Sequence, residues 1–266
     1  MPGTARSLSI VTSFALIVVC LGGCAQYTVP GGPADFRALG VSVERQAQMT
    51  DWDLADEFDR QPAASFPARV AVVRLQDRGY AEWDYSARKR GSVSVVTRRE
   101  VETDEHFERV NSLEGIAQIA MLNSFVLPDR VSSVDDLRAS AAAVQADMLL
   151  AYTLDTRFGV EKVVPFLGEI TLGIFPAKES RVTSTASAVL LDTRTGYIYG
   201  LAEGTSKTSQ LANAWTKRDA VEQSRRRAER EAFDALVGEI ETMWGRTYSA
   251  FERANEVVVE PAAEGG

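Results

Sequence analysis

The sequence Leu-Gly-Gly-Cys at residues 21–24 forms a lipobox at the end of an apolar run, and no other motif constrains the mature chain as strongly. Arg6 supplies the positive charge with which a secretory signal peptide begins. The two glycines are the small residues that a signal peptidase needs beside its cleavage site. We therefore expect residues 1–23 to be removed as a signal peptide and lipid, including palmitate, to be attached to Cys24.

Two alternatives to this interpretation are weaker. A membrane-spanning helix needs roughly 20 apolar residues, and the run from Leu8 to Gly23 is shorter. Cys20 follows the bulky Val19 where a small residue is required, so Cys24 is the better candidate for lipidation. Once Cys20 is removed, the mature chain has no second cysteine for an intramolecular disulfide, and its stability must come from an ordinary hydrophobic core.

The rest of the chain is predicted to form a tether, one domain and a tail. Residues 24–48 contain the helix breakers Pro-Gly-Gly-Pro and little apolar periodicity, which indicates a lipidated flexible tether. Residues 49–248 are predicted to form a single α/β domain, and residues 249–266 a flexible tail. Ala25 follows the lipidated cysteine in place of the aspartate that retains enterobacterial lipoproteins in the inner membrane. We therefore expect anchoring in the outer membrane, with the domain facing the periplasm.

Apolar periodicity predicts a mixed sheet of about five or six strands with packed helices and a long C-terminal helix. Strands are predicted at residues 69–75, 92–97, 148–154, 181–191 and 197–206. The third of these is almost continuously apolar, as in a central strand covered on both faces. The turn at residues 192–196 joins the last two strands into a hairpin.

Helices are predicted to begin at Thr50, after Asp104, at Ser133 and at about Asn213, the last of them running to Trp244. In the first helix, Trp52, Ala55 and Phe58 give one apolar face. In the second, Phe107, Val110, Leu113 and Ile116 recur at helical spacing, and a further apolar stretch follows at residues 116–122. The helix at Ser133 opens with a capping box that includes Asp136.

Charge and composition argue against several classes of function. The net charge of −8 disfavours nucleic-acid binding, because phosphates need a basic surface. It also disfavours broad electrostatic binding to anionic lipid. The only histidine, His106, has no second group at metal-ligand or triad spacing, so we expect it on a helix surface. No glycine-rich phosphate loop follows a strand. We predict no catalysis, no cofactor and no metal site.

A basic cluster at residues 225–230 has two interpretations. Acidic residues alternate with its arginines at spacings that allow pairing along a helix. A solvated, salt-bridged helix face is therefore favoured over an anion-binding site.

Two segments are candidates for contact with a partner or another subunit. Tyr80, Trp83 and Tyr85 crowd one loop, which is either a lid that closes the edge of the core, the favoured interpretation, or an exposed binding surface. The second segment is residues 163–176, an unusually apolar connection. Its members on one alternating phase include Phe166, Ile170, Leu172 and Ile174.

Three interpretations of residues 163–176 remain open. An edge strand or loop packed on the domain's own core is favoured, followed by a subunit contact and then by an arm that inserts into membrane. A membrane-spanning strand needs about 9–11 residues, so length alone permits insertion. Pro165, Gly168 and Gly173 weaken a regular strand.

The order of elements resembles a group of periplasmic lipoprotein domains. Ala146-Asp147 leads into an apolar strand, Asp192-Thr193-Arg194-Thr195-Gly196 turns one strand into its hairpin partner, and a long helix ends the domain. These features are similar to the group that contains the curli-secretion lipoprotein, the lipoprotein activators of penicillin-binding proteins and the amino-terminal domain of the Tol-Pal β-propeller protein. The resemblance covers roughly residues 69–244.

The resemblance implies an α/β domain that binds protein partners or assembles into rings and has no chemistry of its own. The group places a helix directly after its first strand, whereas this chain has an aromatic loop and another strand there, so the subfamily stays open. We expect a lipid-anchored envelope accessory protein that binds a protein partner or self-associates. The alternative is a ring-forming secretion or channel subunit that uses residues 163–176.

Overall fold

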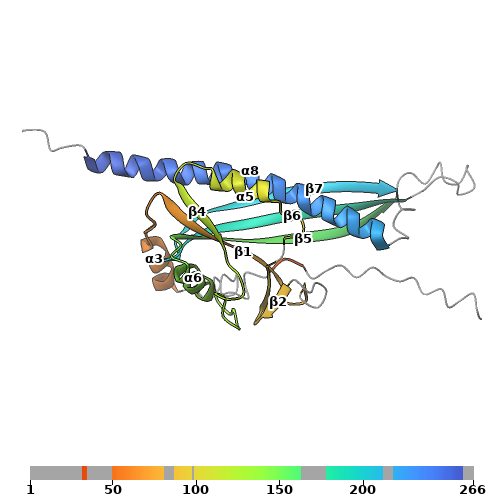
Figure 1. The fold of residues 1–266 in the computed structure, drawn as a ribbon, viewed down its shortest axis with the longest axis horizontal. Coiled ribbons are helices and arrows are strands. Elements are labelled where there is room, and N and C mark those ends of the chain that lie inside the picture. The colour runs from red at the N-terminus through yellow and green to blue at the C-terminus, as the bar shows by residue number, and fades with distance from the viewer. Residues whose placement is uncertain are drawn as a thin grey trace, which may run out of the picture.

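The computed structural model describes residues 32–34, 50–80, 87–97, 99–162, 178–211 and 218–259. The described chain is an α/β domain with a mixed sheet, packed helices and a long C-terminal helix, as predicted (Figure 1). The sheet has seven strands, where about five or six were predicted. The strands are β1 (Ala68–Asp77), β2 (Ala87–Arg90), β3 (Val93–Val96), β4 (Ile116–Met121), β5 (Met148–Lys162), β6 (Lys178–Asp192) and β7 (Ile198–Leu211). The helices are α3 (Asp51–Asp59), α5 (Asp104–Asn111), α6 (Val134–Ala143) and α8 (Arg218–Val259).

The sheet has the strand order β2-β3-β1-β5-β6-β7, with β4 beside β1. On one side, β1 pairs in parallel with the start of β5. On its other side, the first half of β1 pairs in parallel with β4 and the second half antiparallel with β3. The predicted central strand and the predicted hairpin, β6 with β7, are both confirmed.

Helices cover both faces of the sheet. On one face, α8 and α5 pack over apolar side chains of β1, β5 and β6 (Figure 1). The buried stripe of α8 includes Ala228, Ala232, Leu236 and Ile240. On the other face, α6 packs over alternate residues of the same strands through Leu137 and Ala141.

Gly204 of β7 allows α8 to approach the sheet very closely. A Cβ atom at this position would collide with the backbone nitrogen of Leu236 and the backbone oxygen of Ala232. The absence of a side chain is therefore a condition of this helix-on-sheet packing.

The sheet has two strands that the apolar pattern did not predict. Strand β2 is a short edge strand with three basic residues and no apolar alternation. Strand β4 begins at Ile116, although the apolar residues up to this point keep a helical spacing. The helix ends earlier because Gly115 reverses the chain in a left-handed conformation at φ 80°. A side chain at Gly115 would also collide with the ring of Tyr248.

The C-terminal helix is longer than predicted. We expected it to end near Trp244 and a tail to begin at residue 249, but α8 continues to Val259. Phe66 explains the extension, because its ring lies 5.7 Å from Trp244, 5.5 Å from Tyr248 and 4.4 Å from Phe251. Aromatic contacts thus hold about two further turns of α8, as far as Phe251, against the segment that precedes β1.

None of the helices in the described ranges combines the length and apolar character needed to cross a membrane. The predicted signal peptide, Cys24 and most of the tether lie outside the described residues.

Candidate functional site

A buried ion pair joins the centre of the sheet to the segment before α5. Arg74 of β1 lies 3.0 Å from Glu102, and Tyr152 of β5 donates a hydrogen bond of 2.9 Å to the same carboxylate. Burial opposes ionisation of Glu102, but Arg74 holds its pKa below the ordinary value. Burial and the neighbouring carboxylate raise the pKa of the Tyr152 hydroxyl. Arg74, Glu102 and Tyr152 therefore form one buried network of an ion pair and a hydrogen bond.

A second buried ion pair lies under the first part of α8. Arg225 is fully buried and binds Glu222 and Glu229 of its own helix, each at 2.6 Å. It also lies 3.4 Å from Glu100, and Thr156 of β5 donates a hydrogen bond to Glu229. The basic cluster was predicted to be a solvated face, and for Arg225 that prediction is wrong. The linear pattern showed the pairing, but not that the sheet covers this arginine.

His106 is also buried, contrary to the expectation that it lies on a helix surface. The residue is 7% exposed, and its ring packs edge-on against Phe233 at 5.2 Å. Its Nδ1 accepts a hydrogen bond from the backbone nitrogen of Thr103, which completes the N-terminal capping box of α5. Nε2 lies 3.5 Å from Asp234. Its contacts with Thr103 and Phe233 cap and pack α5.

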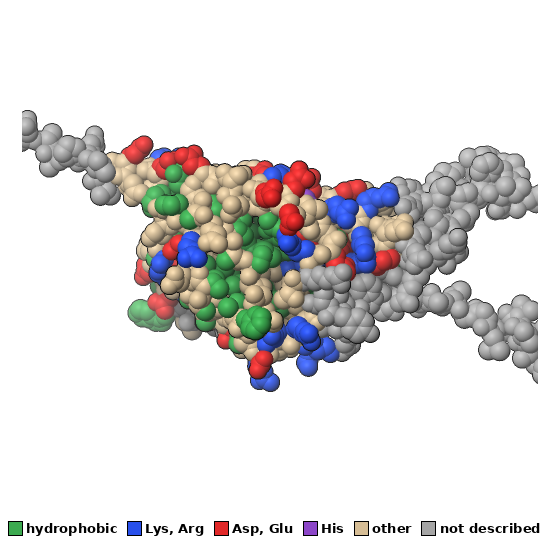
Figure 2. Space-filling model, viewed as in Figure 1, with side chains coloured by type: hydrophobic (Ala, Val, Ile, Leu, Met, Phe, Trp, Pro, Cys, Tyr) green, Lys and Arg blue, Asp and Glu red, His purple; other side chains and the backbone are tan. Residues whose placement is uncertain are grey.

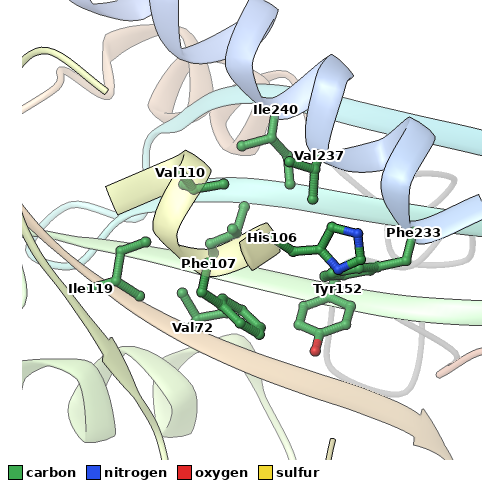
Figure 3. Close-up of a pocket in the computed structure, with 10 residues that line it drawn as sticks. Val72, His106, Phe107, Val110, Ile119, Tyr152, Phe233, Val237 and Ile240 are labelled. Carbon is green, nitrogen blue, oxygen red and sulfur yellow. The ribbon is translucent and has the colours of Figure 1, made fainter. Parts of the chain in front are cut away.

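A small pocket lies between α5, α8 and the sheet (Figure 3). In Figure 3, Val110 of α5 lies beside Val237 and Ile240 of α8, and the Phe107 ring points from α5 toward Val72 and Tyr152 of the sheet. The lining is almost wholly apolar, and the space is about that of one water molecule. Within the described ranges, no group of three or more histidine, cysteine or acidic side chains lies close enough to hold a metal ion. This pocket is therefore a packing defect rather than a substrate site.

The turn between β6 and β7 is organised by Asp192. One oxygen of its carboxylate accepts hydrogen bonds from the backbone of Arg194 and Thr195. The other accepts from the backbone of Ala63 at 2.7 Å and from the Tyr199 hydroxyl at 2.8 Å. Burial alone would raise the pKa of Asp192, but these donors hold it below the ordinary value.

The two short motifs that carry the sequence resemblance lie against each other. Asp147 accepts a hydrogen bond from the backbone of Arg69 and pairs with Arg194 at 3.1 Å. Arg194 belongs to the turn that Asp192 organises, and the backbone nitrogen of Thr193 donates to the Asp147 carbonyl. Both aspartates therefore have a structural role, which is to align β1, β5 and the β6–β7 turn.

The side chains that stand out in the structure are apolar and exposed. On α3, Trp52 is 84% exposed and Phe58 is 86% exposed, and Leu54 is also exposed. Figure 2 shows apolar side chains projecting at the lower left, where Figure 1 places α3. Every described side chain of α3 is exposed, so the apolar face predicted for this helix is not covered by the domain. Large exposed aromatic groups are typical of binding surfaces.

Of the contact residues predicted from the sequence, the structure describes one and leaves the others outside its described ranges. Tyr80 is 1% exposed and packs with Ala87 and Val96, so it belongs to the core edge, as the lid interpretation had it, and cannot serve as a partner contact. Its ring also lies under the Arg74 guanidinium. Trp83, Tyr85, Phe166, Ile170, Leu172 and Ile174 lie outside the described residues.

Sequence reasoning treated α3 as an ordinary amphipathic helix and so missed it as a candidate site. A signal was present, since its nine residues carry five acids and no base. With so many carboxylates on a short helix, few side chains remain that could be buried against the domain.

Comparison with known proteins adds little to this geometry. No family model matches the chain, and no curated protein matches it. Among solved structures, it is similar to the hypothetical protein CT253 from Chlamydia trachomatis, at 11% identity and a TM-score of 0.26. The match covers 65% of this chain and 95% of that one. A likeness at this level carries no argument about function.

Proposed function

We propose that the chain is a lipid-anchored envelope accessory protein that faces the periplasm and binds a protein partner or another copy of itself, without catalysis of its own. The lipobox at residues 21–24 supports the lipid anchor. Ala25, in place of an aspartate after the lipidated cysteine, supports the outer membrane, with the domain facing the periplasm. The observation that carries the binding role is the exposure of Trp52 and Phe58 on α3.

Helix α3 is too short to be stable by itself. An isolated helix shorter than about 12–15 residues is marginal in water, and helices in proteins owe most of their stability to a packed apolar face. In α3 that face is exposed, although it carries a tryptophan and a phenylalanine. Docking on another protein would supply the missing packing, which is the reason that we place the binding site here.

The position of α3 in the chain suits this role. It directly follows the predicted tether, which starts at Cys24. Within that segment, residues 32–34 lie against the sheet: the Asp77 backbone nitrogen donates to the Gly32 carbonyl, and the Ala34 backbone nitrogen donates to the Thr153 hydroxyl at 2.8 Å. The prediction of a flexible tether is therefore wrong for these three residues. Because no more than the eight residues 24–31 separate the lipid from this docked point, α3 would work close to the membrane surface and meet partners that are anchored there.

The buried charged groups that the structure describes have structural roles. Arg74, Glu102, Arg225 and Glu229 each have an ion-pair partner within the protein. The space beside His106 and Tyr152 is too small for a substrate. These groups stabilise the contact of α5 and α8 with the sheet.

The alternative function is a subunit of a secretion or channel ring, and one observation favours it. Only residues 148–151 of β5 pair with β1, while β5 and β6 pair along their whole length, as far as Lys162 with Lys178. In the sequence, residues 163–177 connect the ends of these two strands. Leu172→Glu would dissociate a ring held by this segment and leave the size of a monomer unchanged.

The test of the proposed function is the molar mass of the lipidated protein in mild detergent, measured by light scattering during size exclusion. We expect a complex larger than one chain, and a loss of mass when Trp52→Ala is combined with Phe58→Ala. Leu201→Ala is the matched control, because Leu201 is an exposed apolar residue on β7. A double variant that keeps the mass of the unmodified complex contradicts the proposal, and an unmodified protein of one chain mass excludes stable self-association in detergent and leaves a different protein as the partner.

A further inference from the structure

We infer that the partner of α3 is a second copy of this chain, and that α3 of one copy docks on the basic edge of the sheet at β2 of the next. The inference rests on the proposed function and names its partner. It follows from two surfaces of this chain that are complementary in charge and in apolar character.

The first surface, called the α3 face, consists of Trp52, Leu54 and Phe58 together with Asp56 and Asp59. On a helix with 3.6 residues per turn, the two aspartates flank Trp52 at positions i+4 and i+7. The helix itself has five acidic residues and no basic residue, and Arg60, which follows it, pairs with Glu57 at 2.8 Å, so the charge around the exposed aromatic groups is predominantly negative. Such a face fits a surface that combines an apolar side chain with several cations.

The second surface, called the β2 surface, consists of Arg88, Lys89, Arg130 and Phe125. Arg88 and Lys89 are exposed on the edge strand β2, and Arg130 is exposed on the neighbouring loop. Phe125 on the same loop is 95% exposed. Figure 2 shows basic side chains gathered at the lower edge of the molecule, where Figure 1 places β2.

The loop that carries Phe125 and Arg130 is held firmly against β2. Arg90 donates hydrogen bonds to the Pro128 carbonyl and to Asp129, at 3.0 and 2.8 Å. The backbone of Val131 donates to the Arg90 carbonyl. The exposed phenylalanine and the exposed cations therefore form one preorganised surface, which lowers the entropy cost of docking.

The two surfaces do not meet within one copy. In Figure 1, α3 and β2 lie on either side of α6. Contact between two different surfaces of the same chain is head-to-tail, and it generates a closed ring or an open filament. The inference thus gives a route to self-association that does not need residues 163–176.

The strength of the contact agrees with a membrane-tethered assembly. A nine-residue helix on one loop and strand buries less than the roughly 1,000 Å² of a stable interface, so a single contact is weak. Lipid anchors concentrate copies in one plane and convert a weak contact into a persistent one. The α3 face is less suited to binding a lipid surface, because the carboxylates of α3 are repelled by anionic headgroups.

The test uses the full lipidated protein in phosphatidylcholine vesicles with a photoreactive phenylalanine analogue in place of Phe58. Irradiation should give a covalent dimer, and the attachment point should map to residues 87–91 or 123–131. Asp56→Lys combined with Asp59→Lys should lower the dimer yield about tenfold, as should Arg88→Glu combined with Arg130→Glu, because each pair of changes creates like-charge contacts. The chain with all four substitutions should recover the dimer, since the charges are again opposite.

Lysines at positions 56 and 59 do not penalise the helix, because cations are favourable near a helix C-terminus. A dimer that maps to α3 of the second copy, adducts to lipid alone, or no recovery in the fourfold variant overturns the inference. If the same probe in cells instead labels a different protein, the inference fails while the proposed function stands. If it labels no protein in either setting, both fail.

Discussion

Arg74 and Glu102 form an ion pair whose side chains are 2% and 0% exposed, beside the apolar core that α5 and α8 form with the sheet. Removing one partner of such a pair leaves an uncompensated buried charge, which costs about 3–5 kcal/mol of stability. We therefore expect Arg74→Met to lower the free energy of unfolding by that amount in urea titrations.

The matched control is Arg74→Met combined with Glu102→Gln. This double variant has no unpaired charge, and it should be more stable than Arg74→Met alone. Equal or lower stability of the double variant would show that the ion pair is not the reason for the loss.

Asp192 should make the stability of the domain depend on pH in the acidic range. Its pKa in the folded protein lies below the ordinary value of about 4, so it binds fewer protons than in the unfolded chain. Its contribution is fully present above that ordinary value and is lost as the pH falls through the lowered pKa. At neutral pH, Asp192→Asn should cost about 2–4 kcal/mol, because four donors lose a charged acceptor.

The difference in unfolding free energy between the unmodified protein and Asp192→Asn should then shrink as the pH is lowered from 5 toward 2. Denaturant titrations at several pH values measure this difference. Glu239→Gln, at an exposed position on α8, should leave the pH profile unchanged. A constant difference across the range would exclude the assigned role of Asp192.

Gly204 and Gly159 offer a matched pair of strand glycines. Gly204→Ala should lower stability by about 1–3 kcal/mol, because the new methyl group forces α8 away from β7. Gly159→Ala should have little effect, since nothing lies within 4 Å of the added atom. Thermal unfolding of both variants gives the comparison, and an equal loss would mean that close helix approach is not what requires Gly204.

Lipidation at Cys24 predicts a simple fractionation result. Cys24→Ala should fail to incorporate a labelled fatty acid and should leave the membrane fraction. Cys20→Ala should be labelled and anchored like the unmodified chain. Labelling that survives Cys24→Ala would refute the lipobox assignment.

The sequence predicted those parts of the fold that depend on local apolar patterning. The continuously apolar run at residues 148–154 gave the central strand, and the turn after Leu191 gave the hairpin. The boundary of α5 was wrong because Gly115 reverses a chain whose apolar spacing still looks helical. The end of α8 was wrong because the stabilising ring, Phe66, is remote in sequence.

Site prediction was weaker because exposure is a tertiary property. An aromatic residue in a loop, such as Tyr80, and one on a helix, such as Phe58, look alike in sequence, yet the first is buried and the second exposed. Arg225 shows the reverse case, since its i+4 partner was visible but the sheet that covers both was not. Only packing distinguishes a structural charge from a functional one.

The most direct test of the account is photo-crosslinking in living cells from position 58, with the lipid anchor intact. The account predicts an irradiation-dependent adduct with protein from position 58 and none from position 157, an exposed site on β5. The absence of any protein adduct at position 58, or equal labelling from both positions, would contradict the claim that α3 is the surface through which this protein binds its partner.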